Sequence, residues 1–133
     1  MFSLETMGYY TDEADSQKYP PSVAWLYPNT GNFVGMVGNK KSRKLAERTI
    51  KLFREKVKFP SQAAALPEKM VGVGFSDQWS FWQEDYPGLM ITDTAFFRYP
   101  HYHTPEDTPD QLDFTRFARV VEGLQRVFAE LAN

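Results

Sequence analysis

The two histidines of the chain, His101 and His103, stand two residues apart in a segment that carboxylates flank on both sides, Asp93 before it and Glu106 after it. Imidazole and carboxylate groups are common zinc ligands. The segment follows an apolar run that begins at Leu89 and reads as a buried strand, and α/β folds place their sites where such strands end. The pattern is compatible with a metal site. Histidines that only hydrogen-bond within a loop are the alternative.

Two further carboxylates, those of Glu5 and Asp77, stand at positions where a side chain could take part in a functional site. Glu5 interrupts an otherwise apolar stretch, and a buried carboxylate is costly unless it is paired or bound to a metal. The alternative for Glu5 is a side chain that faces water from an edge strand. Asp77 follows Ser76, a predicted N-cap, at the start of a short helix expected to end near Glu84. Helix capping is the alternative for Asp77.

The elements that must position these residues alternate between strands and helices. Period-2 patterns and short apolar runs predict four strands, at Phe2–Tyr10, Phe33–Val37, Gln62–Leu66 and Leu89–Asp93. A helix over Lys40–Val57, with Ser42 as its N-cap, separates the second and third strands. The alternation predicts an α/β layer architecture, and the length of 133 residues suits a single domain over 1–133.

The last helix has the most regular pattern in the chain. Asp113 is a predicted N-cap, and an apolar stripe follows at spacings of three and four residues: Phe114, Phe117, Val121, Leu124, Phe128 and Leu131. Ala118, Val120 and Val127 widen the apolar face. A wide face of this kind predicts packing on a sheet rather than a coiled coil.

Composition excludes several classes of function. The chain has no cysteine, which excludes disulfide scaffolds and thiolate zinc sites. Nine Lys or Arg lie between Lys40 and Lys58, yet the formal net charge is -2, so we read this run as a solvated helix face and expect no nucleic-acid partner. No apolar run is long enough for a membrane span and the first residues show no signal-peptide pattern, so we expect no membrane partner and a cytoplasmic location.

Four motifs together resemble a known enzyme family. Ser3–Tyr10 (SLETMGYY) is similar to a strand motif with an acid followed by glycine, and Ser76–Trp82 (SDQWSFW) to an S-D-H-x-x-F-W motif. Tyr86–Ala95 is similar to the strand that comes next, and Tyr102–Thr108 (YHTPEDT) to a Y-H-T-x-x-D-T motif. These motifs, in this order, resemble the zinc-dependent aminopeptidase and glutaminyl-cyclase family, peptidase family twenty-eight.

The resemblance implies a role for individual residues. Family members hydrolyse an amino-terminal peptide bond with two zinc ions and a glutamate base. By resemblance Glu5 is a ligand of one zinc, His103 a ligand of the other, Asp77 lies just behind the site, and Tyr102 contacts substrate. The implied fold is a three-layer α/β/α sandwich with a mixed sheet of about four strands. In it, the Glu5 strand runs parallel to its neighbour Leu89–Asp93, and the other two strands lie antiparallel to them.

The chain also departs from the family pattern. The H-x-D motif and the Glu-Glu pair of the family are absent, and Gln78 stands where the family has histidine. We therefore expect the carboxy-terminal half of a catalytic domain, with weak or no zinc binding and no residue of its own that completes catalysis. A peptide substrate is expected only if the missing half is supplied. The alternative is a non-catalytic remnant that acts as a binding or oligomerising module.

An association between copies is also expected. In the intact family domain, the strand that carries Glu5 pairs on both sides. Without the other half, Phe2–Tyr10 would be an open edge with no proline or lysine to block it. We expect a homodimer in which two such strands pair about a twofold axis.

Overall fold

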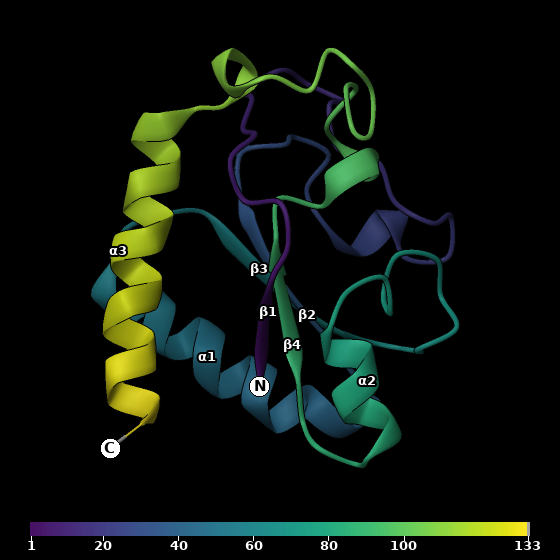
Figure 1. The fold of residues 1–133 in the computed structure, drawn as a ribbon, viewed down its shortest axis with the longest axis vertical. Coiled ribbons are helices and arrows are strands. Elements are labelled where there is room, and N and C mark those ends of the chain that lie inside the picture. The colour runs from purple at the N-terminus through teal and green to yellow at the C-terminus, as the bar shows by residue number, and fades with distance from the viewer. Residues whose placement is uncertain (133) are drawn as a thin grey trace.

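The computed structural model describes residues 1–132 and contains a mixed four-stranded sheet in the order β1-β4-β2-β3 (Figure 1). The strands are β1 (Phe2–Leu4), β2 (Val34–Asn39), β3 (Ser61–Leu66) and β4 (Leu89–Thr92). β1 runs parallel to β4, β2 antiparallel to β4, and β3 parallel to β2. The α/β class expected from the sequence pattern is confirmed, and so are the mixed sheet and the strand directions that the family resemblance implies.

The first strand is shorter than predicted. It ends at Leu4 rather than continuing to Tyr10. Beyond Leu4, the N–H of Glu5 donates to the carbonyl of Ile91 at 3.0 Å, and the carbonyl of Thr6 accepts the N–H of Asp93 at 2.7 Å. Thr6 then takes a left-handed conformation, with φ of 42°, which turns the chain out of the extended path. The alternating pattern beyond Leu4 therefore belongs to a loop that the sheet edge holds in place.

Three helices accompany the sheet: α1 (Arg43–Lys56), α2 (Gln78–Gln83) and α3 (Phe114–Leu131). The carboxylate of Asp113 accepts the N–H of Arg116 at 2.9 Å, so the predicted cap of α3 is confirmed. Ser42 is the N-cap residue of α1, as predicted, but its side chain makes no capping hydrogen bond, and the Asn39 side chain accepts the N–H of Ser42 at 2.9 Å. The predicted cap at Ser76 is wrong, because Asp77 is the residue that precedes α2 and the Ser76 hydroxyl bonds elsewhere. Four short 3-10 turns occupy Ala24–Leu26, Lys40–Ser42, Ala95–Phe97 and Pro109–Gln111.

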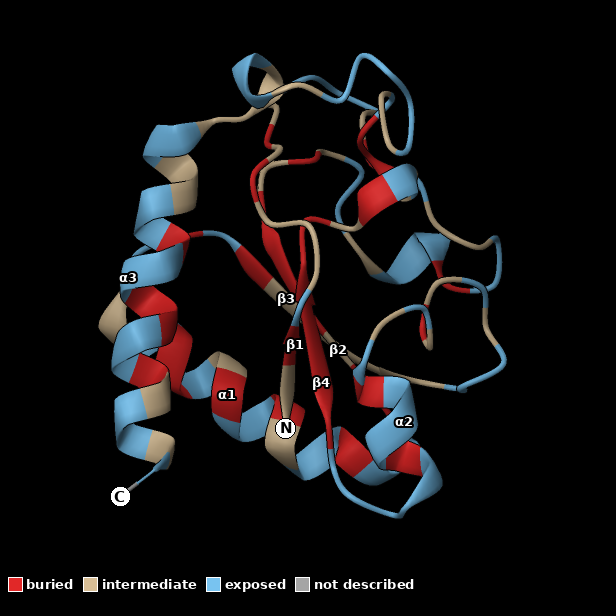
Figure 2. Cartoon of the chain, in the orientation of Figure 1, coloured by how far each residue is buried: buried red, intermediate tan, exposed pale blue. Residues whose placement is uncertain are grey.

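The apolar core lies between one face of the sheet and the helices α1 and α3 (Figure 2). It contains strand residues that alternate in sequence, together with aromatic and aliphatic residues of the helices: Val34, Met36, Leu89, Ile91, Phe53, Val120, Leu124 and Val127. These positions are 0–3% exposed. Side chains at the intervening strand positions lie on the opposite face of the sheet, where the loops and α2 lie. Both faces are covered in the middle of the sheet, because β4 is buried at all of its positions.

The buried face of α3 is rotated from the predicted stripe. Val120, Gly123, Leu124 and Val127 are buried, whereas Phe114 and Val121 are 58% and 47% exposed. Gly123 explains the rotation, because it lets α3 approach the ring of Phe53 on α1 closely. Among residues 1–132, none of the helices combines the length and the apolar character that crossing a membrane requires.

Candidate functional site

Glu5 leaves the sheet at the end of β1, on the face opposite the main core. Its carboxylate accepts a hydrogen bond from the Ser76 hydroxyl at 2.9 Å, and the Ser76 oxygen lies 2.6 Å from the hydroxyl of Ser3. A hydroxyl has a single proton, so Ser76 donates to Glu5 and Ser3 donates to Ser76. These hydrogen bonds through Ser3 and Ser76 orient the carboxylate of Glu5 and leave its other oxygen available.

The end of β4 is fixed by another carboxylate, that of Asp93, which is buried. Asp93 is 2% exposed, and its two oxygens accept the N–H groups of Tyr9 at 2.9 Å and of Ala95 at 3.0 Å. Thr94 and Ala95 both have positive φ, 78° and 48°, which is strained for residues with a Cβ, above all for a β-branched one. The hydrogen bonds to Asp93 oppose that strain and set the direction in which the chain leaves the sheet.

Arg98 holds the loops around these strand ends together. Its Nε donates to the Gln17 side chain at 2.7 Å and its Nη1 to the carbonyl of Phe33 at 2.8 Å, while the guanidinium lies 4.6 Å from the centre of the Phe33 ring. Burial lowers the pKa of Arg98 to about 10, although the negative charge of Asp93 acts in the opposite direction. Nη2 has no hydrogen-bond partner among residues 1–132. The buried guanidinium of Arg98 therefore connects the loops that contain Gln17 and Phe33.

Gln17 extends this network to the strained turn after β4. Its amide nitrogen donates to the Thr94 hydroxyl at 2.9 Å, and the Thr94 N–H donates to the Thr92 hydroxyl at 2.8 Å. The Thr92 hydroxyl in turn lies 3.2 Å from that of Thr6, the residue after Glu5. The left-handed turns after β1 and after β4 are thus linked through threonine side chains.

Tyr102 and His103 follow on the segment that this network supports. Tyr102 lines the same pocket as Glu5, and its pKa is raised, mainly by burial and also by the negative charge of Glu5. His103 is exposed, has a positive φ of 58°, and stacks on Tyr102 with 3.8 Å between the ring centres. Tyr102 thus lines a pocket together with Glu5 and also contacts the imidazole of His103.

The pocket that Glu5 and Tyr102 line is apolar and has a volume of about 100 Å³. Its floor is the sheet face away from the core, and its walls are loop residues rich in aromatic side chains, among them Tyr19, Phe33, Phe75, Phe96 and Phe97. Phe96 lies 4.4 Å from Phe97 and 5.8 Å from Tyr102 between ring centres. Glu5 is the one carboxylate among the described residues that line this pocket.

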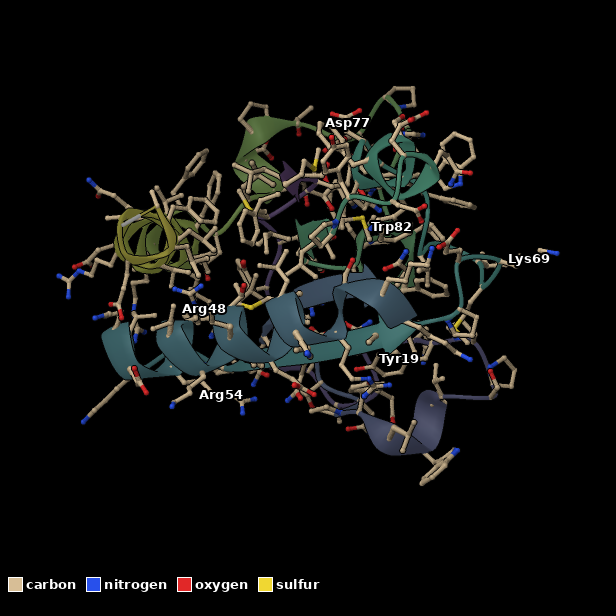
Figure 3. The ribbon with its side chains drawn as sticks, turned by 90° about the horizontal axis from the view of Figure 1, so that it is seen from below. Tyr19, Arg48, Arg54, Lys69, Asp77 and Trp82 are labelled. Carbon is tan, nitrogen blue, oxygen red and sulfur yellow. The ribbon has the colours of Figure 1, made fainter. Side chains whose placement is uncertain are left out.

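Asp77 is placed apart from the pocket lining. It is exposed at the start of α2, whereas Trp82 of the same helix points inward and donates from its indole nitrogen to the carbonyl of Gly88 at 3.1 Å (Figure 3). The fully buried Gln78, at the position of the family histidine, donates to the carbonyl of Val73 at 2.9 Å. The predicted role of Asp77 behind the site remains a prediction.

Sequence reasoning missed part of this arrangement. Ser76 was assigned to a helix cap, although it bonds Glu5. Arg98 and Gln17 were not singled out. The apolar pair Phe96–Phe97 just before Arg98 is at most a weak signal of its burial, because Phe96 itself is 41% exposed. Gln17, 81 residues away from Arg98, offers no such local signal.

Residues 1–132 do not by themselves form a complete zinc site. In the described part of the chain, no three His, Asp or Glu side chains converge in a way that could hold a metal ion. Structural and catalytic zinc ions take three or four protein ligands. Glu5 and His103 offer one donor group each, so no reaction step through a metal is derived from these residues alone.

The chain resembles one protein family and one curated relative in detail. The family model of "Peptidase family M28" matches residues 24–127, which include Asp77, Tyr102 and His103 but not Glu5. The uncharacterized protein YfbL of Escherichia coli (strain K12) is 38% identical over 125 residues, or 93% of this chain. The chain spans only 39% of the length of that relative. No solved structure matches significantly. Because the family model matches most of this chain, the chain belongs to peptidase family M28.

Proposed function

We propose that this chain forms one wall of a zinc-dependent peptidase site, in which Glu5 and His103 are ligands of two different zinc ions and Tyr102 lies beside the substrate. The observation that carries the proposal is that Glu5 and Tyr102 line one pocket, although 97 positions separate them in the sequence. Membership of a peptidase family supports the reaction class, hydrolysis of a peptide or related amide bond.

The pocket suggests the kind of substrate. Its lining is almost entirely apolar apart from Glu5 and a few hydroxyl and amide groups, and its volume of about 100 Å³ suits an aliphatic side chain. An amino-terminal residue with such a side chain would place its backbone near the carboxylate. We therefore propose a preference for peptides that begin with an apolar residue.

Catalysis requires groups that this chain does not supply. Each zinc would have one protein ligand here, and its remaining ligands and a general base would come from a complementary polypeptide. We expect the chain alone to bind zinc weakly and to have no peptidase turnover. The alternative, a module that binds or assembles without catalysis, predicts no zinc binding through Glu5 or His103.

Zinc titration of the isolated chain by calorimetry distinguishes these possibilities. We expect weak binding that Glu5→Gln and His103→Ala each reduce. The matched controls are Glu106→Gln, an exposed carboxylate in the same segment as His103, and His101→Ala, the other histidine. Binding that none of these substitutions changes would remove the ligand assignment. Tight stoichiometric zinc with hydrolysis of leucyl-p-nitroanilide by the chain alone would contradict the incomplete site.

The substrate preference has its own test. Leucinamide at millimolar concentration should shift the NMR signals of Tyr102 and Phe96, whereas glycinamide, which lacks the side chain, should shift them less. Shifts confined to other surfaces would overturn the substrate assignment and leave the zinc ligands to the titration.

A further inference from the structure

Two glycines lie inside β2, Gly35 and Gly38, and packing explains only the second of them. A Cβ on Gly38 would lie 2.6 Å from a methyl carbon of Leu89 and 2.9 Å from the Cβ of Ser42, and both of these residues are fully buried. Neighbours packed at the density of a protein interior have little space to withdraw. Position 38 therefore requires glycine.

Gly35 is under no such constraint. The three atoms nearest to a Cβ at this position would be the carbonyl oxygen of Thr92 at 3.3 Å, the methyl carbon of Thr92 at 3.6 Å and that of Thr94 at 3.8 Å. Only the first of these contacts is tight, and a small shift relieves it. The conformation of the backbone does not require glycine either, because the φ of Gly35 is not positive.

A bulge does not account for Gly35, since β2 pairs regularly on both sides there. Thr92 of β4 and Gln62 of β3 lie directly opposite Gly35, and the register continues along both neighbours. A glycine inside a strand weakens it, and where no bulge or bend requires one, it marks a place that a ligand or another backbone approaches closely. The position of Gly35 in the sheet shows which approach is available.

Gly35 belongs to the floor of the candidate pocket. Leu4 is opposite Ile91, so Glu5, the next residue, lies beside Thr92, and Thr92 is opposite Gly35. Neighbouring strands are about 4.8 Å apart, so the α-carbons of Glu5 and Gly35 are about 10 Å apart across β4. Glu5, Thr92 and Gly35 all line the pocket. The missing side chain therefore leaves space in the floor, two strands away from the carboxylate.

The floor around this space is apolar. Val37 is opposite both Met90 of β4 and Ala64 of β3, and all three line the pocket. None of them carries a charge or a hydrogen-bonding side chain, so the space above Gly35 suits an apolar group. Strands of this chain form the floor, whichever polypeptide supplies the remaining zinc ligands.

We propose that Gly35 sets the size limit for the first side chain of the substrate, an inference that rests on the proposed peptidase function. A substrate whose amino-terminal residue is held near Glu5 would extend its side chain along the floor toward Gly35. The separation of about 10 Å admits a branched apolar side chain such as that of leucine, whereas an alanine side chain ends well before Gly35. A larger residue in place of Gly35 should therefore impair the binding of leucine derivatives and spare alanine derivatives.

Titration of the chain with leucinamide and with alaninamide, followed through the NMR methyl signals of Val37 and Met90, tests the proposal. The wild-type chain should bind leucinamide more tightly. Gly35→Val should weaken leucinamide binding by about tenfold, because its methyl groups fill the space that the leucine side chain needs, and should change alaninamide binding by less than about twofold. The matched control is Ala65→Val, which adds bulk to β3 at a position that does not line the pocket and should leave both affinities unchanged.

A second variant, Gly35→Ala, adds a single carbon and should melt at the same temperature as the wild-type chain. It should also weaken leucinamide binding, by less than Gly35→Val does, and leave alaninamide binding unchanged. Leucinamide binding that neither folded variant weakens, or an equal loss for both amides, would overturn the assignment of Gly35 and leave the pocket in place. If leucinamide does not shift the Val37 signals of the wild-type chain, the proposed substrate pocket is wrong, and the role of Gly35 with it.

Discussion

The hydroxyl of Ser76 donates to the carboxylate of Glu5 at 2.9 Å, across 71 positions of sequence. This hydrogen bond joins the end of β1 to the turn that leads into α2. It is charge-assisted and therefore stronger than a bond between neutral groups. The serine of the S-D-Q segment thus orients the carboxylate that we propose as a zinc ligand.

Removal of this hydroxyl should destabilise the chain moderately. We expect Ser76→Ala to lower the free energy of unfolding by about 1–2 kcal/mol, because the carboxylate and Ser3 both lose a partner in a half-buried site. Urea denaturation measures the change. Ser80→Ala, which removes an exposed serine hydroxyl from α2, should change it by less than about 0.5 kcal/mol. Equal effects of the two substitutions would show that the Glu5 contact contributes little.

The close contact between α1 and α3 depends on Gly123. A Cβ at this position would lie 2.6 Å from the Phe53 ring and 2.7 Å from a methyl of Val57. Phe53 is fully buried and has no room to withdraw. Gly123→Ala should therefore lower the melting temperature, with a cost of about 1–3 kcal/mol from overpacking that outweighs the gain in helix propensity of about 1 kcal/mol.

The helix-propensity contribution can be measured separately. Ala118→Gly, at an exposed position of the same helix, should cost about 1 kcal/mol without any change in packing. If Gly123→Ala instead stabilised the chain by that amount, the close approach of the two helices would be wrong.

The buried guanidinium of Arg98 should not be replaceable by lysine. An ammonium group cannot reach Gln17 and the carbonyl of Phe33 together in the planar geometry that Arg98 uses. Arg98→Lys should cost about 2–4 kcal/mol of unfolding free energy, because buried acceptors lose their donors. Arg48→Lys, on the exposed face of α1, is the control and should be nearly neutral. A neutral Arg98→Lys would contradict the network.

Alkaline pH should weaken the fold through Tyr10. Burial, and then the negative charge of Asp93, raise the pKa of the Tyr10 phenol above its usual value of 10.0, and the hydroxyl donates to the carbonyl of Met7 at 2.8 Å. Above pH 10 the unfolded chain loses this proton while the folded chain retains it, so the free energy of unfolding falls as pH rises. Below pH 10 the contribution is fully present.

Urea denaturation at pH 9 and at pH 10.5 measures this dependence. Tyr10→Phe should reduce the loss of stability between the two values, whereas Tyr86→Phe, which removes a phenol that is 63% exposed, should not. An identical loss in wild type and Tyr10→Phe would assign the alkaline sensitivity to other groups.

Much of the architecture follows from local patterns. The three longer strands were predicted to within two residues at either end, because apolar runs bounded by turn residues depend on neighbours in sequence. The cap at Asp113 was predicted for the same reason. The end of β1 was not predicted, because the left-handed turn at Thr6 is held by hydrogen bonds to Thr92 and Asp93 at the end of β4, more than eighty residues away.

The candidate site likewise has features that follow from the sequence and features that depend on the tertiary structure. The sequence by itself determined the family resemblance, the identity of Glu5, Tyr102 and His103, and the shortage of metal ligands, since residue types and their order need no coordinates. Only the tertiary structure decided that Ser76 orients Glu5 and that Arg98 joins the loops. It also decided which side of α3 is buried, because that choice depends on how closely Gly123 lets α3 approach Phe53. Contacts of this kind depend on distances between elements remote in sequence, which no local pattern encodes.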